Sequence, residues 1–218
     1  MLTAAAVIAA SYAIGSVPVA WLVARLRGGV DLRRVGSGNT GASNLFQTVS
    51  KKLVVPVGMA QVGQGLAGIV IARAVGEPAS VQVACGIAAV AAYNWSPWLG
   101  LQGGRGVGPA IGYLTALTTF DALPVFIAVA LLGVPAGASP LSVAAALLVT
   151  PVAAYAGGEP RAVVAGCGIV AMLVLVKRVL GNEPPVPDAA RPGVYVTRLL
   201  YDRDIRDREA WVRRRAGG

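Results

Sequence analysis

The sequence contains no histidine and only two cysteines among its 218 residues. Without histidine, the chain has neither a catalytic triad with an imidazole base nor a zinc site with histidine ligands. Cys85 and Cys167 each stand inside an apolar run, with a spacing that fits neither a metal site nor a redox pair. We interpret both as small buried apolar residues, and we expect no metal ion and no cofactor.

Charged residues are also scarce. They make up 13% of the sequence, whereas a soluble domain carries about 25%, and 56% of the residues are hydrophobic. The first apolar run, Leu2 to Leu26, is too long for a cleaved signal peptide and no basic segment precedes it. This composition is typical of a membrane protein, and we expect the run to be its first span.

Apolar stretches of suitable length recur along the chain and predict an all-α protein with about seven transmembrane helices. The expected spans are 2–26, 53–75, 79–100, 106–120, 121–136, 138–157 and 161–180. The fourth and fifth are short, and Asp121 and Pro124 interrupt them, so merging them would give six spans. Small residues on several spans predict close helix packing. The glycines expected to pack in this way are Gly63, Gly65, Gly68, Gly166 and Gly168.

The basic residues orient these spans. With seven spans, loops 27–52, 100–105 and 137 and the chain beyond 181 share one side. Of the 19 lysines and arginines, all except Arg73 and Arg161 lie on this side or at its helix ends. Because cytoplasmic loops are enriched in Lys and Arg, we predict an outside N-terminus and a cytosolic tail. A merge to six spans would place the arginine-rich tail outside, so we reject it.

The sequence divides into a transmembrane domain, 1–181, and a basic cytosolic tail, 182–218. The tail opens with Glu183-Pro184-Pro185-Val186-Pro187, which predicts a stiff extended linker. Residues 196–215 could form a surface helix on anionic lipid, or the tail could be partly disordered. Acidic residues alternate with its arginines, so we do not expect nucleic acid as a partner.

Two glycine-rich segments on the predicted cytosolic side carry hydroxyl, amide and basic side chains. The first is 28–52, with Gly36-Ser37-Gly38-Asn39 at its centre, and the second is Gly103-Gly104-Arg105-Gly106. Glycines let backbone N–H groups approach an anion, and arginine adds forked donors. Together the segments predict a site for a phosphorylated small molecule or a lipid head group. Each alone could also be a connector between two spans.

These segments resemble a known family. Tyr12-Ala13-Ile14-Gly15-Ser16-Val17-Pro18, Gly28-Gly29-Val30-Asp31-Leu32-Arg33 and the run from Gly36 to Asn44 are similar to the start of the bacterial acyl-phosphate-dependent glycerol-3-phosphate acyltransferases. Gly103-Gly104-Arg105-Gly106-Val107 resembles their second motif, and Lys177 to Glu183 resembles the end of their third. The resemblance implies a seven-span enzyme of the bacterial plasma (inner) membrane. It would transfer an acyl group from acyl phosphate to the 1-hydroxyl of glycerol 3-phosphate, giving lysophosphatidic acid for phospholipid biosynthesis.

The resemblance also implies site residues. Ser37 and Arg105 would be catalytic, and acyl phosphate and glycerol 3-phosphate would be the substrates, with membrane lipid around them. The substrate phosphates would be bound by Gly36, Ser37, Gly38, Asn39, Asn44, Gln47, Gly103, Gly104, Arg105 and Gly106. Asn44 could instead cap the following helix, and Glu183 fits a helix end better than a catalytic acid. No general base is evident, and a substrate phosphate could serve in that role.

The chain departs from the family pattern at several polar positions. The stretch Met172 to Val176 is apolar where the third motif usually carries a histidine and an asparagine. The other replacements are Gln47 for arginine, Gln61 and Gln64 for aspartate and lysine, Tyr93 for histidine and Arg105 for lysine. A non-catalytic relative that binds phospholipid head groups or a partner enzyme therefore remains an alternative. A transporter is less favoured, since no ionisable residue falls in the middle of a span.

Overall fold

The computed structural model describes residues 1–118, 120–182 and 193–207. Every regular element in these ranges is helical, in agreement with the predicted all-α class. The helices are α1 (Leu2–Ser16), α2 (Val19–Gly28), α3 (Ala42–Thr48), α4 (Val54–Ala74), α5 (Ala79–Asn94), the 3-10 helix η1 (Pro97–Leu99), α6 (Val107–Leu117), α7 (Ala122–Leu132), α8 (Ser139–Ala156), α9 (Arg161–Leu180) and α10 (Gly193–Tyr201).

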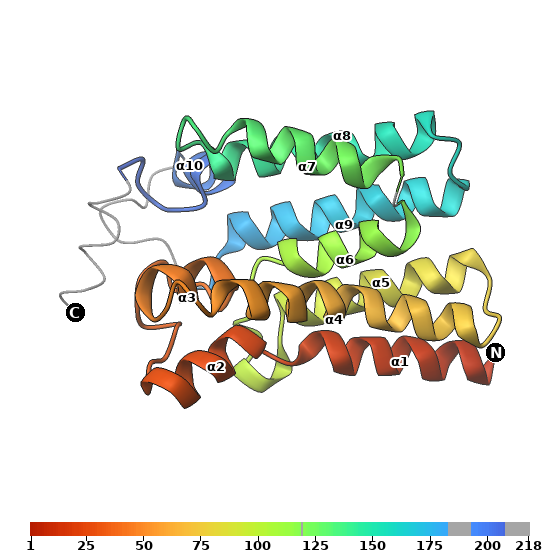
Figure 1. The fold of residues 1–218 in the computed structure, drawn as a ribbon, viewed down its shortest axis with the longest axis horizontal. Helices are drawn as coiled ribbons and strands as arrows, with labels where there is room; N and C mark the ends of the chain where they lie inside the picture. Colours follow the sequence, from red (N-terminus) through yellow and green to blue (C-terminus); the bar gives the residue numbers. More distant parts are fainter. Residues whose placement is uncertain (119, 183–192, 208–218) are drawn as a thin grey trace.

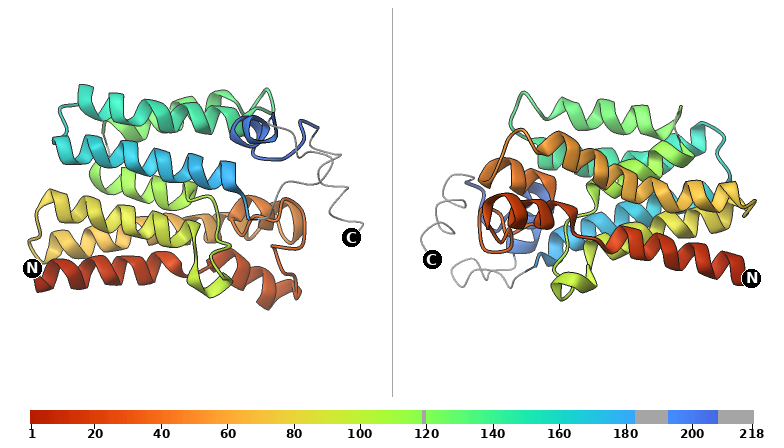
Figure 2. Two further views of the ribbon diagram at one scale, coloured as in Figure 1. Left: turned by 180° about the vertical axis from the view of Figure 1, so that it is seen from behind. Right: turned by 60° about the horizontal axis from the view of Figure 1, so that its bottom comes forward.

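The long helices lie side by side and run between two ends of the molecule (Figure 1). The N-terminus is at one end, and α2, α3 and α10 gather at the opposite end, which we call the loop end. The views from behind and from below show the same arrangement (Figure 2). The segments that the basic residues assigned to one side of a membrane therefore do lie at one end of the fold.

Within the described residues, four helical stretches are long and apolar enough to cross a membrane: Leu2–Gly28, Val54–Ala74, Ser139–Ala156 and Arg161–Leu180. α6 and α7 are apolar but have only 11 residues each, and α5 has 16. α5 ends at Asn94, six residues before the expected end of its span, because Pro97 starts a separate turn. A count of seven spans stays a prediction.

The first span is broken between α1 and α2 at Pro18, which has no backbone N–H to continue the helix. The break leaves carbonyl groups at the end of α1 without helical partners. The Gln64 amide on α4 donates to two of them, the carbonyls of Ile14 and Val17, both at 2.8 Å. Each carbonyl also accepts one backbone N–H, from Val17 at 3.4 Å and from Val19 at 2.9 Å, so Gln64 adds a second donor and has a structural role at this break.

Glycines let several helices pack against each other. A Cβ atom at Gly65 would overlap the backbone of Pro109, and one at Gly68 would overlap Ser11. Gly166 lies equally close to Tyr113, so the predicted packing role of these three glycines is confirmed. The prediction is wrong for Gly63 and Gly168, because an added Cβ at either position would meet no atom within 4 Å.

A small apolar cluster fixes the segment between α2 and α4. Leu32 from the loop and Leu45 from α3 are fully buried against Ala20 and Ala24 of α2 and Val57 of α4. Fully burying a side chain of leucine size stabilises a fold by roughly 1.5–3 kcal/mol. The first glycine-rich loop is therefore attached to the helices at both of its ends.

The tail contributes α10, which packs against α8 and α9. It covers only part of the predicted stretch 196–215, and it starts three residues earlier. Val194 and Arg198 are buried on its inner face, so α10 lies on the other helices with at least this side. Residues 208–215 of that prediction, the linker 183–187 and Glu183 all lie outside the described residues.

Candidate active site

Asn44 organises the first glycine-rich loop from the first turn of α3. Its side chain is fully buried. Its amide donates to the carbonyls of Leu32 at 2.9 Å, Val35 at 3.0 Å and Asn39 at 2.9 Å, and its Oδ1 accepts the N–H of Ser37 at 3.1 Å. The loop from Leu32 to Asn39 therefore surrounds the Asn44 side chain and is held by it.

This use of Asn44 differs from both sequence-based interpretations. Asn44 lines neither cavity of the site described below, and its side chain is fully buried, so it does not face a site for a substrate phosphate. It does not cap α3 either, because the N-cap position is Gly41. Asn44 instead satisfies backbone groups of the turn, which buried polar side chains commonly do.

Gly36 and Gly38 allow the turn that Asn44 encloses. Both have left-handed backbone angles, with φ of 57° and 67°. A Cβ atom at Gly36 would also overlap the Asn44 side chain. The glycines of this motif are thus required by the geometry of the loop itself.

Asp31 holds the start of the loop. Its Oδ1 accepts hydrogen bonds from Trp21 Nε1 at 2.9 Å and from the backbone N–H and Nε of Arg33, both at 3.0 Å. Its Oδ2 pairs with the Arg33 guanidinium at 2.7 Å. Donation from Arg33 holds the pKa of the Asp31 carboxyl well below its usual range, against the opposing effect of burial.

The second glycine-rich loop is pressed against the end of α5. A Cβ atom at Gly103 would overlap the Tyr93 carbonyl, and one at Gly104 would overlap the Tyr93 ring. Gly106, with φ of 73°, occupies the N-cap position of α6. The first backbone N–H groups of α6 therefore face the space next to Arg105, where a helix favours negative charge.

Asn182, just after α9, connects the two loops. Its side-chain amide donates to the carbonyl of Gly38 at 3.2 Å and to the carbonyl of Gly103 at 3.0 Å. The two glycine-rich loops, which the sequence analysis put on the same side, therefore lie next to each other. Asn182 belongs to the stretch that resembles the third motif, so three motifs meet at one place.

Two adjoining cavities open beside these loops. One, of about 410 Å³, has mainly apolar walls that include Val62, Ile111 and Val143, and we call it the apolar cavity. The other, of about 380 Å³, includes polar residues of the first loop and the tail, and we call it the polar cavity. Both are lined by Asn39, Ser43, Arg105, Ser139, Pro140 and Asp202.

Opposite charges meet where the cavities adjoin. Arg105 Nε lies 2.5 Å from Oδ1 of Asp202, a residue of the segment after α10. Arg178 Nε of α9 lies 3.5 Å from the same oxygen. Burial raises the pKa of the Asp202 carboxyl, and the nearby charges of Arg105, Arg178 and Arg203 act against that rise.

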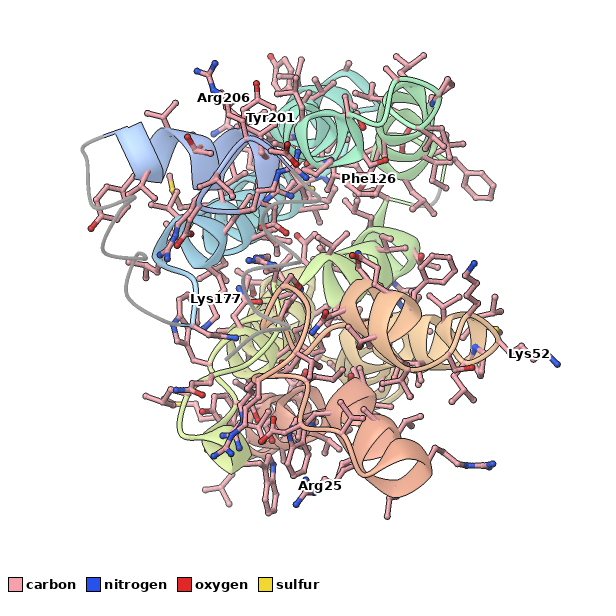
Figure 3. All side chains as sticks on the ribbon, turned by 90° about the vertical axis from the view of Figure 1, so that its left-hand side faces the viewer. Arg25, Lys52, Phe126, Lys177, Tyr201 and Arg206 are labelled. Carbon is pink, nitrogen blue, oxygen red and sulfur yellow. The ribbon has the colours of Figure 1, made fainter. Side chains whose placement is uncertain are left out.

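The adjacent basic residues of α9 point to different places. Arg178 lines the apolar cavity and donates to the carbonyls of Pro140 at 2.7 Å and Leu199 at 3.3 Å. Lys177 instead donates to the Leu101 carbonyl at 3.2 Å and lies over the Trp95 ring. Figure 3 looks onto the loop end and shows Lys177 there at the end of α9. One residue of the pair therefore faces the site, and the other supports the second loop.

The predicted site residues fall into two groups. Ser37 and Gln47 line the polar cavity, Gly106 lines the apolar cavity, and Asn39 and Arg105 line both. The remaining ones line neither cavity and shape the two loops from within. These are Gly36, Gly38, Asn44, Gly103 and Gly104.

Sequence reasoning assigned no role at the site to Arg178, Asn182 or Asp202. A signal existed for Arg178 and Asn182, since both stand in the stretch that resembles the third motif. Asp202 gave no signal, because it is one of several acids that alternate with arginines in the tail. Its contact with Arg105 depends on where α10 docks.

Two of the replaced family positions also line the apolar cavity, namely Gln61 and Tyr93. Gln64 lies away from it, at the break in the first span. The site therefore keeps polar groups at Gln61 and Tyr93, but these carry no charge at neutral pH.

Known proteins are similar to this chain over most of its length. The sequence model described as "Glycerol-3-phosphate acyltransferase" matches residues 5–181. A Glycerol-3-phosphate acyltransferase 4 of Dehalococcoides mccartyi is 30% identical over 213 residues, which cover 95% of this chain and 92% of that protein. A glycerol-3-phosphate acyltransferase of a Synechococcus species is 32% identical over 201 residues, covering 88% of this chain and 99% of that one.

Solved structures agree as well. The glycerol 3-phosphate form of PlsY (YgiH), an integral membrane glycerol 3-phosphate acyltransferase, superposes with a TM-score of 0.74 and is 26% identical. The match covers 81% of this chain and 88% of that one. The family match, the full-length relatives and this fold lead to one conclusion: the chain belongs to the glycerol-3-phosphate acyltransferase family.

Proposed function

We propose that this protein transfers an acyl group from acyl phosphate to the 1-hydroxyl of glycerol 3-phosphate and releases lysophosphatidic acid and phosphate. The observation that supports this best is the pair of cavities that adjoin at Arg105 and Asn39. An apolar cavity suits the start of an acyl chain, and a polar cavity suits phosphate and hydroxyl groups. A reaction between a lipid-like donor and a polar acceptor needs both at one place.

In the proposed reaction, the acceptor hydroxyl oxygen attacks the acyl carbonyl carbon. The bond between that carbon and the phosphate oxygen breaks, and the hydroxyl proton passes to a substrate phosphate. Acyl phosphate is already an activated donor, so the protein has to align the reactants and stabilise negative charge. No protein base is needed when phosphate accepts the proton, which suits a chain without histidine.

Arg105 and Ser37 are the proposed catalytic residues. The Arg105 guanidinium lies at both cavities, so it can hold a phosphate and offset the charge that develops during transfer. The Ser37 hydroxyl lines the polar cavity and accepts the backbone N–H of Asn39 at 3.4 Å. Its own proton is then available to donate to a substrate oxygen.

Phosphate binding is assigned to Asn39, Gln47, Gly106 and the two catalytic residues, while the other glycines and Asn44 keep the loops in shape. Gln47 has an exposed side chain, and its amide lies 3.4 Å from the Ser43 hydroxyl. An amide keeps a donor but adds no charge, so phosphate binding at this edge is weaker than with arginine.

A turnover assay tests the proposal. The full-length protein in detergent, given acyl phosphate and radiolabelled glycerol 3-phosphate, should form labelled lysophosphatidic acid and release phosphate. A Ser37→Ala/Arg105→Ala double variant should be nearly inactive, whereas Arg34→Ala, an exposed arginine of the same loop, should behave as wild type. Equal product with and without the double substitution would disprove the assignment of these residues.

The neutral Gln61 and Tyr93 in the apolar cavity favour one alternative, a non-catalytic relative that binds phospholipid head groups or a partner enzyme. The same assay separates the two functions. If the protein forms no product but still binds glycerol 3-phosphate or anionic head groups, it is the non-catalytic relative.

We place the protein in the bacterial plasma (inner) membrane, with the N-terminus outside and the tail, 182–218, in the cytosol. Exposed basic side chains at the loop end support this orientation. They include Arg25, Arg27, Arg34, Lys51 and Lys52. Arg25 and Lys52 point away from the helices in the view of that end (Figure 3). Anionic lipid head groups on the cytosolic face would attract them.

A further inference from the structure

The segment after α9 places a carboxylate inside the site. The family match ends at residue 181, and Asp202 lies beyond it, yet Asp202 lines both cavities. Its carboxylate is paired with Arg105, the cation assigned to substrate phosphate, and it lies near Arg178. About a quarter of the Asp202 side chain is exposed, and both members of the pair line the two cavities.

The position of Asp202 is fixed by its neighbours. Arg198 of α10 donates to Asp204 at 2.6 and 3.1 Å and to the carbonyl of Leu180, at the end of α9, at 2.8 Å. The backbone N–H of Asp202 donates to the Arg198 carbonyl at 2.9 Å, and its φ of 60° is left-handed. This buried ion pair holds the turn against α9 and keeps Asp202 beside Arg105, whose Nη2 also donates to the Asp202 carbonyl at 3.5 Å.

Arg105 is assigned to a substrate phosphate, but this fold pairs it with the Asp202 carboxylate. A carboxylate carries one negative charge, whereas a phosphate monoester carries close to two at neutral pH and has three oxygens to share. A phosphate that enters between Arg105 and Arg178 therefore brings more negative charge and more acceptor oxygens to the two guanidinium groups than the carboxylate does. The Asp202 side chain can rotate away while the Arg198–Asp204 pair keeps the backbone in place.

We propose that Asp202 is an internal stand-in for the substrate phosphate, a residue of the tail that competes for Arg105 and thereby sets the affinity for phosphate monoesters. This inference rests on the proposed function only for the identity of the ligand. Each substrate molecule has to displace the carboxylate, which lowers the apparent affinity by the fraction of protein in which Asp202 holds Arg105. The tail thus sets the phosphate affinity of the site, although it lies beyond the residues that the family model matches.

The rival role for a carboxylate here is that of general base. A base must release its contact with Arg105 to accept a proton, and pairing with arginine makes a carboxylate less basic. The two roles have opposite kinetic consequences. Removing a competitor lowers KM and leaves kcat unchanged, whereas removing a base lowers kcat by about 10²–10⁴.

The experiment compares Asp202→Asn with Asp207→Asn in the full-length protein in detergent. Asp207 is exposed and belongs to the same segment, so its substitution gives the same change in net charge. Asparagine has the same size as aspartate. Its amide oxygen can still accept a hydrogen bond from Arg105, but a weaker one because it carries no charge. Calorimetric titration with glycerol 3-phosphate and with inorganic phosphate measures affinity without turnover, and thermal unfolding checks that each variant is folded.

We expect Asp202→Asn to bind both ligands about fivefold more tightly, the factor that separates charge-assisted from neutral hydrogen bonds. Its KM for glycerol 3-phosphate should fall by the same factor at unchanged kcat, and Asp207→Asn should match wild type. Unchanged or weaker binding would overturn the proposal, and so would a large loss of kcat at constant affinity. If Asp202→Asn binds phosphate more tightly but neither it nor wild type forms product, the competitor role of Asp202 is supported and the proposed acyltransferase function is rejected.

If Asp202→Asn does not fold, Asp202→Ala provides the same comparison. It removes both the charge and the side-chain contact with Arg105, so the expected gain in affinity is at least as large. A folded Asp202→Ala protein that binds phosphate no more tightly than wild type would overturn the proposal.

Discussion

Asn182 donates a hydrogen bond to the carbonyl of Gly38, a residue 144 positions earlier, at 3.2 Å. The same amide reaches Gly103 at 3.0 Å. One side chain at the end of α9 thus fixes the distance between the two loops that bear Ser37 and Arg105. Alignment of reactants depends on that distance, since small displacements of catalytic groups reduce rates strongly.

Replacing Asn182 should therefore impair activity more than folding. In Asn182→Ala, the loss of two neutral hydrogen bonds should lower the free energy of unfolding by about 1–3 kcal/mol. We expect kcat/KM for glycerol 3-phosphate to fall by at least tenfold, measured in the turnover assay with a parallel thermal unfolding curve. Asn182→Asp should resemble Asn182→Ala, because it keeps the shape but lacks the donors. Wild-type kinetics in both variants would contradict the role of the bridge.

Asn44 should behave as a structural residue of the loop. Asn44→Ala removes three donations and one acceptance from a buried site, so unfolding should become easier by about 2–3 kcal/mol. Asn44→Asp should be as unstable, since a carboxylate cannot donate to the carbonyls of Leu32, Val35 and Asn39. Chemical or thermal unfolding in detergent measures the effect. A stable Asn44→Ala protein with a raised KM alone would instead make Asn44 a direct phosphate ligand.

Arg105 should control the affinity for the phosphorylated acceptor. We expect Arg105→Ala to raise the KM for glycerol 3-phosphate by about tenfold or more, the cost of a charge-assisted hydrogen bond. Arg105→Lys should fall between, because lysine keeps the charge but loses the fork of donors. Steady-state kinetics with varied glycerol 3-phosphate give both values, and Arg34→Ala serves as the control. An unchanged KM in Arg105→Ala would refute the proposed clamp.

Asp31 should contribute to stability in a pH-dependent way. Its pKa is lowered in the folded protein by Arg33, so its contribution is present above the unfolded pKa and is lost as the pH falls through the folded value. At neutral pH, Asp31→Asn should unfold more easily by about 1–3 kcal/mol, and this difference should shrink as the pH drops below about 4. Thermal unfolding across pH measures it. A difference that does not change with pH would show that the charge of Asp31 is unimportant.

The proposed orientation can be tested by labelling single introduced cysteines. Lys52→Cys lies at the loop end, and Ser80→Cys lies in the first turn of α5 at the opposite end, both exposed. Because Cys85 and Cys167 are buried, they can stay in place. In intact cells, a membrane-impermeant maleimide should label Ser80→Cys and spare Lys52→Cys, which should react only after permeabilisation. The reverse pattern would invert the topology.

Hydropathy predicted where the long helices lie, but it did not predict where each of them ends. The long apolar runs of α4, α8 and α9 agree with expected spans to within a few residues. The predicted span 79–100 passed over the end of α5, because residues 95–100 carry no charge although Pro97 has already ended the helix. The composition of a segment cannot reveal where a backbone turn interrupts it.

Residue type predicted the chemistry of the site better than individual contacts. Ser37, Asn39 and Arg105 stood out as polar residues beside glycines, and they do line the cavities. Asn44 had the same appearance, but its side chain points into the loop. Which face of a short helix a polar side chain occupies depends on how that helix docks.

By itself, the sequence determined the all-helical fold, the membrane solvent, the two glycine-rich loops and their likeness to one family, because these follow from local composition and motifs. Only the tertiary structure decided that Asn182 joins the loops, that Arg178 faces the cavity while Lys177 does not, and that Asp202 meets Arg105. Each of these contacts links residues far apart in the sequence. They exist only once α9 and α10 have packed against the other helices, so no local pattern encodes them.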